Sequence, residues 1–191
     1  FIETILKNNP DSIVVIDEAY IDFGGTSCVS LIDKYDNLVV TQTYSKSRSL
    51  AGIRLGVALG NKEVISHLYD VKNSFNSYPI DYITQQIALA SILDDQDTKQ
   101  KCAKIIKTRE KTKQKLKELG FVVLDSYANF VFVKHPDVDG QELFMALRKE
   151  GIIVRHWNKE RIDQYLRITI GTDDQMDALL EFLEKYLKKN R

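Results

Sequence analysis

The chain has 191 residues, 43% of them hydrophobic and 28% charged, with 27 basic and 27 acidic side chains. This length and composition support a real hydrophobic core, and zero net charge gives no support to nucleic-acid binding, which needs a basic excess. Cys28 and Cys102 form neither a disulfide framework nor a zinc motif, which favours a reducing compartment. No apolar run approaches the roughly 20 residues that cross a bilayer, so we expect no membrane contact.

The first part of the chain alternates strand-like apolar runs with helical patterns. A short helix ending before Asn9-Pro10 precedes a buried strand over 13–16, and further strands are expected over 38–43 and 56–59. Short helices are expected over 29–35 and, after the third strand, over 62–72. Strands that alternate with helices are typical of an α/β layer with a mostly parallel sheet.

Two amphipathic helices are expected next, over 80–93 and then to Leu119, where Gly120 ends the second one. The pattern then changes, and it indicates a compact α+β unit of roughly a hundred residues. Its expected strands cover 121–124, 130–133, 152–155 and 165–170, and its expected helices cover 140–150 and 173–188.

The segment from Thr43 to Gly56 carries one lysine among hydroxyl side chains. Lys46 ends an apolar strand between Ser45 and Ser47, and Arg54 follows eight positions later. A lysine in this setting can react with an aldehyde, while hydroxyls and a guanidinium suit a phosphate. Lysine, aldehyde and phosphate together point to pyridoxal phosphate (PLP). Taken alone, Lys46 also suits a solvated side chain, and Arg54 a surface ion pair.

Two polar residues follow the first buried strand. Asp17 stands at its carboxyl end, where open α/β sheets place ligands, and Tyr20 comes three residues later. A carboxylate there can keep the ring nitrogen of PLP protonated, and a phenol can bind the ring hydroxyl. On position alone, Asp17 also suits the capping of a turn, and Tyr20 a half-buried aromatic role.

Two arginines interrupt apolar strands of the second part. Arg155 ends the run Ile152–Val154, and Arg167 lies inside Leu166–Ile170. An arginine within an apolar strand is costly unless it is paired. Each is therefore expected to meet a carboxylate or phosphate of a ligand, or an internal acidic residue.

The order Asp17, Tyr20, Ser45, Lys46, Arg54 and Arg167 resembles that of fold-type I PLP-dependent aminotransferases. The stretches Ile16–Tyr20, Thr43–Gly56 and Leu166–Gly171 look most like those of the histidinol-phosphate aminotransferases. Threonine-phosphate decarboxylases have very similar motifs. The resemblance covers the C-terminal half to two thirds of a family member, and we expect the chain to be a piece of a longer protein.

The resemblance implies a fold class, α/β, and an activity. Residues 1–79 would be part of the large PLP-binding domain, with a mostly parallel sheet, and 80–191 a linking helix and a small C-terminal α+β domain. The activity would be amino transfer between histidinol phosphate and 2-oxoglutarate in histidine biosynthesis. The full-length enzyme would be a cytoplasmic homodimer acting on a small amino-acid or phosphate substrate, and the truncated chain alone would have an incomplete site.

The resemblance also implies roles at the cofactor. Lys46 would hold PLP covalently and then shuttle a proton between the substrate α-carbon and the cofactor. Asp17 would pair with the pyridine nitrogen, and Tyr20 with the ring hydroxyl. The cofactor phosphate would be held by Thr43, Ser45 and Arg54.

On the substrate side, the resemblance implies that Arg167 binds an acidic group and that Arg155 lies near the substrate phosphate. Asn129 matches a recurring family position near the site. No metal is implied. Three alternatives stay open: a threonine-phosphate decarboxylase, a non-catalytic aminotransferase-like domain that senses PLP or an amino acid, and an inert fragment whose apolar strands bury against themselves or another copy.

Overall fold

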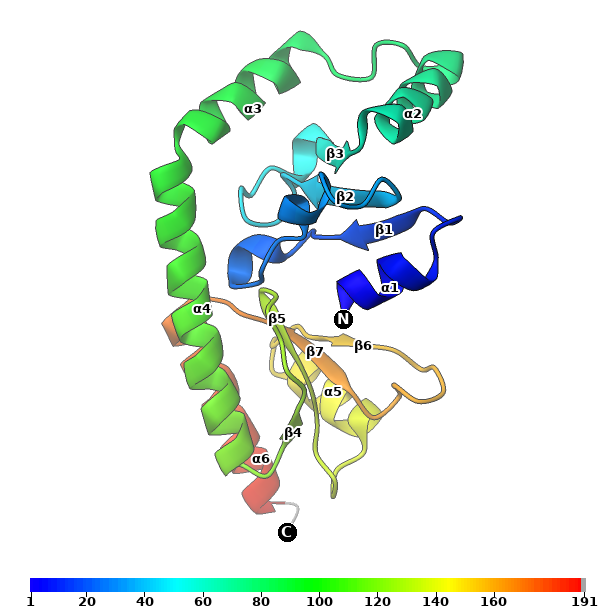
Figure 1. Ribbon diagram of the computed structural model, residues 1–191. Coiled ribbons are helices and arrows are strands. Elements are labelled where there is room, and N and C mark those ends of the chain that lie inside the picture. The colour runs from blue at the N-terminus through cyan, green and yellow to red at the C-terminus, as the bar shows by residue number, and fades with distance from the viewer. Residues whose placement is uncertain (190–191) are drawn as a thin grey trace. The chain divides into compact units, whose positions relative to one another are not determined.

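The computed structural model describes residues 1–189, which form two compact units, Phe1–Lys101 and a second unit that begins at Cys102 (Figure 1). The first unit includes the helix expected over 80–93. The compact units and the predicted functional domains, 1–79 and 80–191, are therefore divided at different residues. The functional border stays a prediction.

The first unit contains a three-stranded sheet in the order β1 (Val14–Asp17), β2 (Leu38–Thr43), β3 (Gly56–Gly60). The expected parallel pairing is present between β1 and β2, whereas β3 runs antiparallel to β2. The sheet is thus mixed rather than mostly parallel. The connection from β2 to β3 holds only a short 3₁₀ helix, η3 (Ala51–Ile53), and no crossover helix of the kind that joins parallel strands.

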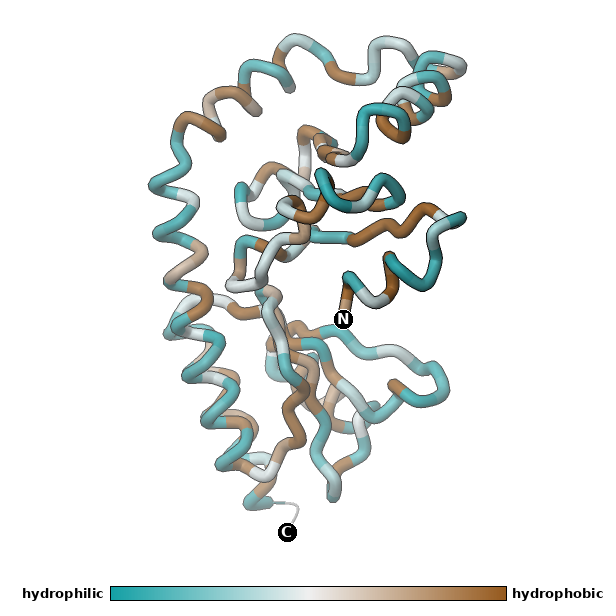
Figure 2. Tube along the Cα trace, viewed as in Figure 1, coloured by the Kyte–Doolittle hydropathy of each residue, from teal (hydrophilic) through white to brown (hydrophobic). Residues whose placement is uncertain are grey.

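One face of this sheet is covered by α1 (Ile2–Asn8), and the small core there contains Leu6, Leu38 and Val40. Figure 2 shows β1 as hydrophobic up to its last residue, yet Val15 on the other face is 57% exposed. Two 3₁₀ turns, η1 (Ile21–Phe23) and η2 (Val29–Leu31), connect β1 to β2. The helix expected over 29–35 is limited to the second of these turns.

Three helices follow the sheet: α2 (Lys62–Phe75), α3 (Tyr82–Leu93) and α4 (Asp95–Glu118). The side chain of Asn61 accepts from the Glu63 amide and caps α2, and Asp81 accepts from Thr84 and caps α3. The predicted stop after α4 is confirmed, since Gly120 has a left-handed φ of 91°.

The second unit contains an antiparallel sheet in the order β4 (Val122–Val123), β5 (Phe130–Lys134), β7 (Leu166–Thr169), β6 (Arg155–His156). Its core lies against α5 (Gly140–Lys149) and α6 (Asp173–Lys189) and includes Val131, Val133, Leu143, Leu147, Leu179 and Leu183.

The strand expected over 152–155 is shorter in the structure, where pairing begins only at Arg155. The amide of Ile152 donates to the carbonyl oxygen of Leu147 at 2.9 Å and so completes the end of α5. Ile152 and Val154 pack on the core from this loop. Their hydrophobicity reflects burial, which the sequence pattern alone did not separate from strand pairing.

Glu18 is the acidic residue that fastens the first sheet to its loops. It is only 6% exposed, and its carboxylate accepts hydrogen bonds from Ser27 Oγ at 2.8 Å, the Cys28 amide at 2.6 Å and Gln42 Nε2 at 2.9 Å. Its own amide donates to Thr41 at 2.8 Å. Buried carboxylates are tolerated when their oxygens are satisfied in this way. Glu18 therefore connects the ends of β1 and β2 with the loop between them.

We predict that Leu147→Ala destabilises the chain by about 2–5 kcal/mol, because it opens a cavity in the core of the second unit. Leu147 is fully buried on α5, whereas Met145 on the same helix is 53% exposed. Met145→Ala is the matched control and should change stability by about 0.5 kcal/mol or less. Urea unfolding of the two variants tests this, and equal losses would contradict the assigned core.

We predict that Glu18→Gln lowers the free energy of unfolding by about 1–3 kcal/mol, because the new amide nitrogen would face donors that now bind a carboxylate. Glu63→Gln, at an exposed position of α2, serves as the control. Both variants should be compared by urea denaturation near neutral pH. A loss no larger than that of the control would remove Glu18 from its proposed structural role.

Candidate active site

Lys46 lies in the loop that leaves the carboxyl end of β2. Its side chain is exposed, and its Nζ atom lies 5.5 Å from the centroid of the Tyr20 ring. Tyr20 comes from the turn after β1, so two residues that are 26 positions apart meet here. The structure thus brings together two of the predicted site residues, in a geometry that suits a cation–π contact.

Asp17 ends β1 at the same edge of the sheet. It pairs in register with Thr41 of β2, and its Oδ1 atom accepts from the Ala19 amide at 3.0 Å. That bond is a local turn contact, as one reading of the sequence predicted. The side chain is exposed. Both the turn-capping role and a role toward a ligand are therefore compatible with its position.

Thr43 and Ser45 form a hydroxyl pair at the start of the loop. The Oγ1 atom of Thr43 accepts from the Ser45 amide at 3.1 Å and lies 3.0 Å from Ser45 Oγ. It also lies 3.4 Å from the carbonyl oxygen of Leu55, next to Arg54. The hydroxyl pair and the residue preceding β3 are thereby joined at the two ends of the loop.

Arg54 adopts a left-handed backbone conformation with φ 55°, and its Nη1 atom donates to the carbonyl oxygen of Ala51 at 2.9 Å. The guanidinium is exposed. Within residues 1–189, the arginines that form ion pairs are Arg48 and Arg109. Arg54 therefore carries its charge without an acidic partner, which does not match the surface ion pair considered from the sequence.

The rest of the loop is fastened on both sides of Lys46. The hydroxyl group of buried Ser47 donates to the carboxylate of Asp22. The guanidinium of Arg48 donates to the Ser91 carbonyl oxygen at 2.5 Å and to Asp95 at 3.2 Å. These contacts attach the loop to the turn after β1 and to α3 and α4. Lys46 is consequently presented on a loop with fixed neighbours.

Cys28 lies beside Glu18, and its surroundings disfavour the thiolate form. Burial raises the pKa of its thiol, and the negative charge of Glu18 raises that pKa further. The thiol therefore stays protonated at neutral pH.

Glu18 is a structural residue that the sequence analysis did not single out. Its position directly after a buried strand, next to Asp17, was the one feature of the sequence that pointed to it.

In the second unit, Asn129 stands just before β5 and accepts from the Ile170 amide with its carbonyl oxygen at 2.9 Å. The preceding carbonyl, of Ala128, accepts from Nη1 of Arg109 at 2.8 Å. Arg109 is 3% exposed and comes from α4, so it fixes the peptide that leads into Asn129. The sequence did not indicate the buried position of Arg109, because α4 is strongly basic and such a pattern is typical of a helix face in contact with solvent.

Arg155 and Arg167 face each other across β6 and β7. The Nε atom of Arg167 is buried and has no hydrogen-bond partner within residues 1–189. No internal acidic residue neutralises either guanidinium in that part of the chain, where Asp95 and Glu110 pair with other arginines. The internal acidic partner, one of the two possibilities drawn from the sequence, is thus absent in that part of the chain, and the ligand group stays a prediction.

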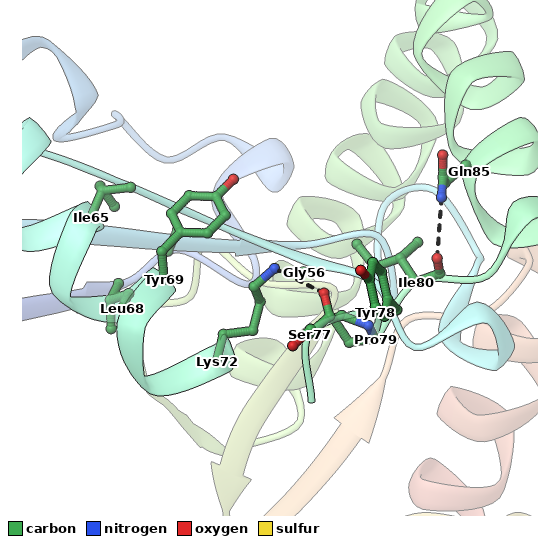
Figure 3. A pocket seen from close by; sticks show the side chains of 11 residues that line it. Gly56, Ile65, Leu68, Tyr69, Lys72, Ser77, Tyr78, Pro79, Ile80 and Gln85 are labelled. Carbon is green, nitrogen blue, oxygen red and sulfur yellow. Dashed lines mark hydrogen bonds between the residues drawn. The ribbon is translucent and has the colours of Figure 1, made fainter. Parts of the chain in front are cut away.

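A pocket of about 440 Å³ lies between β3, α2 and the segment that leads to α3 (Figure 3). Tyr69 and Lys72 of α2 line it opposite Tyr78, and the Nζ atom of Lys72 donates to the Ser77 carbonyl oxygen at 3.4 Å. None of the predicted site residues lines this pocket. It is largely apolar, and no chemistry is assigned to it.

No helix within residues 1–189 is long and apolar enough to span a membrane. The same residues contain no group of three or more side chains that would bind a metal ion.

Residues 1–183 match the family described as aminotransferase class I and II. The chain is 65% identical, over 189 residues, to histidinol-phosphate aminotransferase of Lactococcus lactis subsp. lactis (strain IL1403). The matched region makes up 99% of this chain and 52% of the Lactococcus protein. The chain spans about half the length of the curated relatives it matches.

Solved structures agree with this fold. The histidinol-phosphate aminotransferase of Clostridium acetobutylicum superposes with a TM-score of 0.86 at 26% identity, covering 98% of this chain and 58% of that one. The histidinol-phosphate aminotransferase of Sinorhizobium meliloti, solved in complex with pyridoxal-5'-phosphate, superposes with a TM-score of 0.81 at 21% identity. That match covers 99% of this chain and 53% of the Sinorhizobium chain. The chain therefore belongs to the aminotransferase class I and II family and is a homologue of the histidinol-phosphate aminotransferases.

Proposed function

We propose that the protein containing these residues is a PLP-dependent histidinol-phosphate aminotransferase, which exchanges an amino group between histidinol phosphate and 2-oxoglutarate in histidine biosynthesis. The observation that carries this proposal is the meeting of Lys46 and Tyr20 at the strand ends that also bear Asp17. The high identity to proteins with that name supports the choice of substrate.

The residues at the Lys46 loop fit the chemical groups of PLP. The hydroxyls of Thr43 and Ser45 and the unneutralised guanidinium of Arg54 are the donors that a phosphate needs. Lys46 supplies an exposed amine for the aldehyde carbon. When bound, PLP would serve as an electron sink for negative charge at the substrate α-carbon.

The proposed mechanism assigns proton movement and charge placement to this chain. The Lys46 amine would act as the base that takes up the proton of the substrate α-carbon and would later give that proton back. The carboxylate of Asp17 would keep the pyridine nitrogen protonated, and the phenol of Tyr20 would bind the ring hydroxyl. The cation–π contact with Tyr20 favours a position of the Lys46 amine near that ring.

The arginines of the second unit are proposed to recognise the acidic groups of the substrates. Arg167 has a buried Nε donor to offer, and Arg155 lies opposite it. Both proposed substrates carry two negative charges, one as a phosphate and the other as two carboxylates. Asn129 is proposed to lie near the substrate, on the peptide that Arg109 holds.

We further propose that the complete enzyme is a cytoplasmic homodimer and that residues 1–79 belong to its PLP-binding domain. Large apolar side chains on the first unit support additional contacts: Phe75 on α2 is 80% exposed, and Val15 on β1 is 57% exposed. Such surfaces are usually covered by further chain or by a partner.

In the full-length enzyme, Lys46→Ala should lower amino transfer by at least about 10³-fold, since the proton carrier is lost. It should also remove the visible absorbance of lysine-bound PLP. Lys62→Ala, at an exposed position of the α2 start, is the control and should leave both unchanged. Stopped assays with histidinol phosphate and 2-oxoglutarate, together with absorbance spectra, provide the measurements.

Two outcomes of the same assays would contradict the proposal. Retained activity in Lys46→Ala would exclude its role, and release of CO2 from threonine phosphate without amino transfer would assign a decarboxylase instead.

A further inference from the structure

Two like charges stand directly opposite each other on the second sheet. Arg155 of β6 pairs in register with Arg167 of β7. Side chains at paired positions of antiparallel strands lie on the same face with Cβ atoms about 4.5–5.5 Å apart, where like charges repel. The arginine ion pairs within residues 1–189 belong to Arg48 and Arg109, so no acidic side chain of that part offsets the repulsion.

The neighbour that both arginines share is Trp157. The guanidinium carbon of Arg155 lies 5.4 Å from its ring, and that of Arg167 lies 5.5 Å from the same ring. Both distances are within the range of a cation–π interaction. Arg167 also lies 5.2 Å from the ring of Phe130, so it is held between two aromatic side chains.

The indole of Trp157 is itself held in place. Phe132 meets it edge-on, with ring centroids 6.2 Å apart, and stacks in turn on Tyr165 at 4.7 Å. The residue before the indole is anchored as well, since Nε2 of His156 in β6 lies 2.6 Å from the carbonyl oxygen of Asp163 in the β6–β7 connection.

An aromatic partner leaves the N–H donors of an arginine free, whereas an acidic partner occupies them. A carboxylate would neutralise the arginines and occupy their N–H donors in forked hydrogen bonds. An aromatic face attracts the cation through its quadrupole and uses none of the in-plane donors. The buried and unpaired Nε of Arg167 agrees with this difference.

We infer that Trp157 is a positioning residue that holds the guanidiniums of Arg155 and Arg167 ready to bind one dianionic group, a phosphate monoester or a dicarboxylate. The inference deepens the proposed function, on which it rests for identifying that group as part of the substrate. The arrangement of the three side chains belongs to the second unit alone and requires no cofactor.

The first test uses the intrinsic fluorescence of the 191-residue chain, because Trp157 is its single tryptophan. Inorganic phosphate at constant ionic strength should produce a saturable change in the emission. Arg155→Gln and Arg167→Gln should each weaken the apparent affinity by about tenfold, a loss that corresponds to one substantial contact. Lys159→Gln, an exposed change two residues beyond the indole, should stay within about twofold. Absence of saturation, or equal losses in all three variants, would overturn the inference.

The second test asks whether the aromatic ring matters. Calorimetric titration with phosphate should show binding about tenfold weaker in Trp157→Leu and less than about threefold weaker in Trp157→Phe, which keeps a ring. A thermal unfolding scan of each variant checks that it remains folded. In the Arg155→Gln background, Trp157→Leu should cost less than in the original chain, because the two act together. Additive losses, or equal losses for Leu and Phe, would assign Trp157 a packing role only.

The kinetics of the full-length enzyme separate this inference from the proposed function. Trp157→Leu should raise KM for histidinol phosphate by about tenfold and leave kcat within about twofold, as loss of uniform substrate binding does. An unchanged KM with active enzyme would reject the inference. Phosphate binding that depends on Trp157 in an enzyme without amino transfer would reject the proposed function and keep the inference.

Discussion

The buried carboxylate of Glu18 is the constraint on which the first unit depends. A carboxylate at 6% exposure is stable there only while its donors are in place, and those donors come from the Ser27–Cys28 loop and from Gln42. Gln42 directly precedes Thr43, where the loop of Lys46 begins. The same residue therefore fixes the end of β1 beside Asp17 and the strand end from which the lysine is presented.

Four arginines next to proposed site residues, or among them, divide into two groups by whether they have an acidic partner. Arg48 and Arg109 bind carboxylates and backbone carbonyls, and each secures a segment next to a proposed site residue, Lys46 or Asn129. Arg155 and Arg167 have aromatic neighbours, as Arg48 and Arg109 also do, but within residues 1–189 they form no ion pair. Partner chemistry thus separates guanidiniums that hold the fold together from guanidiniums that remain available to an anion.

Local patterns predicted most of the elements, because strands such as β2 and β5 begin with apolar runs and the helices carry caps and a glycine stop. The direction of β3 and the loop state of 152–154 depend on tertiary packing, which no short pattern encodes. For the site, the positions of Asp17 and Lys46 at the ends of two predicted strands indicated a ligand site at the carboxyl edge of the sheet. The roles of Glu18, Arg109 and Trp157 arise from contacts between distant segments and were not accessible from the sequence.

Arg54 combines a strained backbone conformation with a side chain that is proposed to bind the cofactor phosphate. Its left-handed conformation, with φ 55°, costs a non-glycine residue roughly 1–2 kcal/mol, and glycine would occupy it without that strain. The guanidinium at this position therefore comes at a cost in stability, as is common at functional sites. Arg54→Gly would relieve this strain and at the same time remove the guanidinium proposed to bind the cofactor phosphate, so stability and cofactor affinity should change in opposite directions.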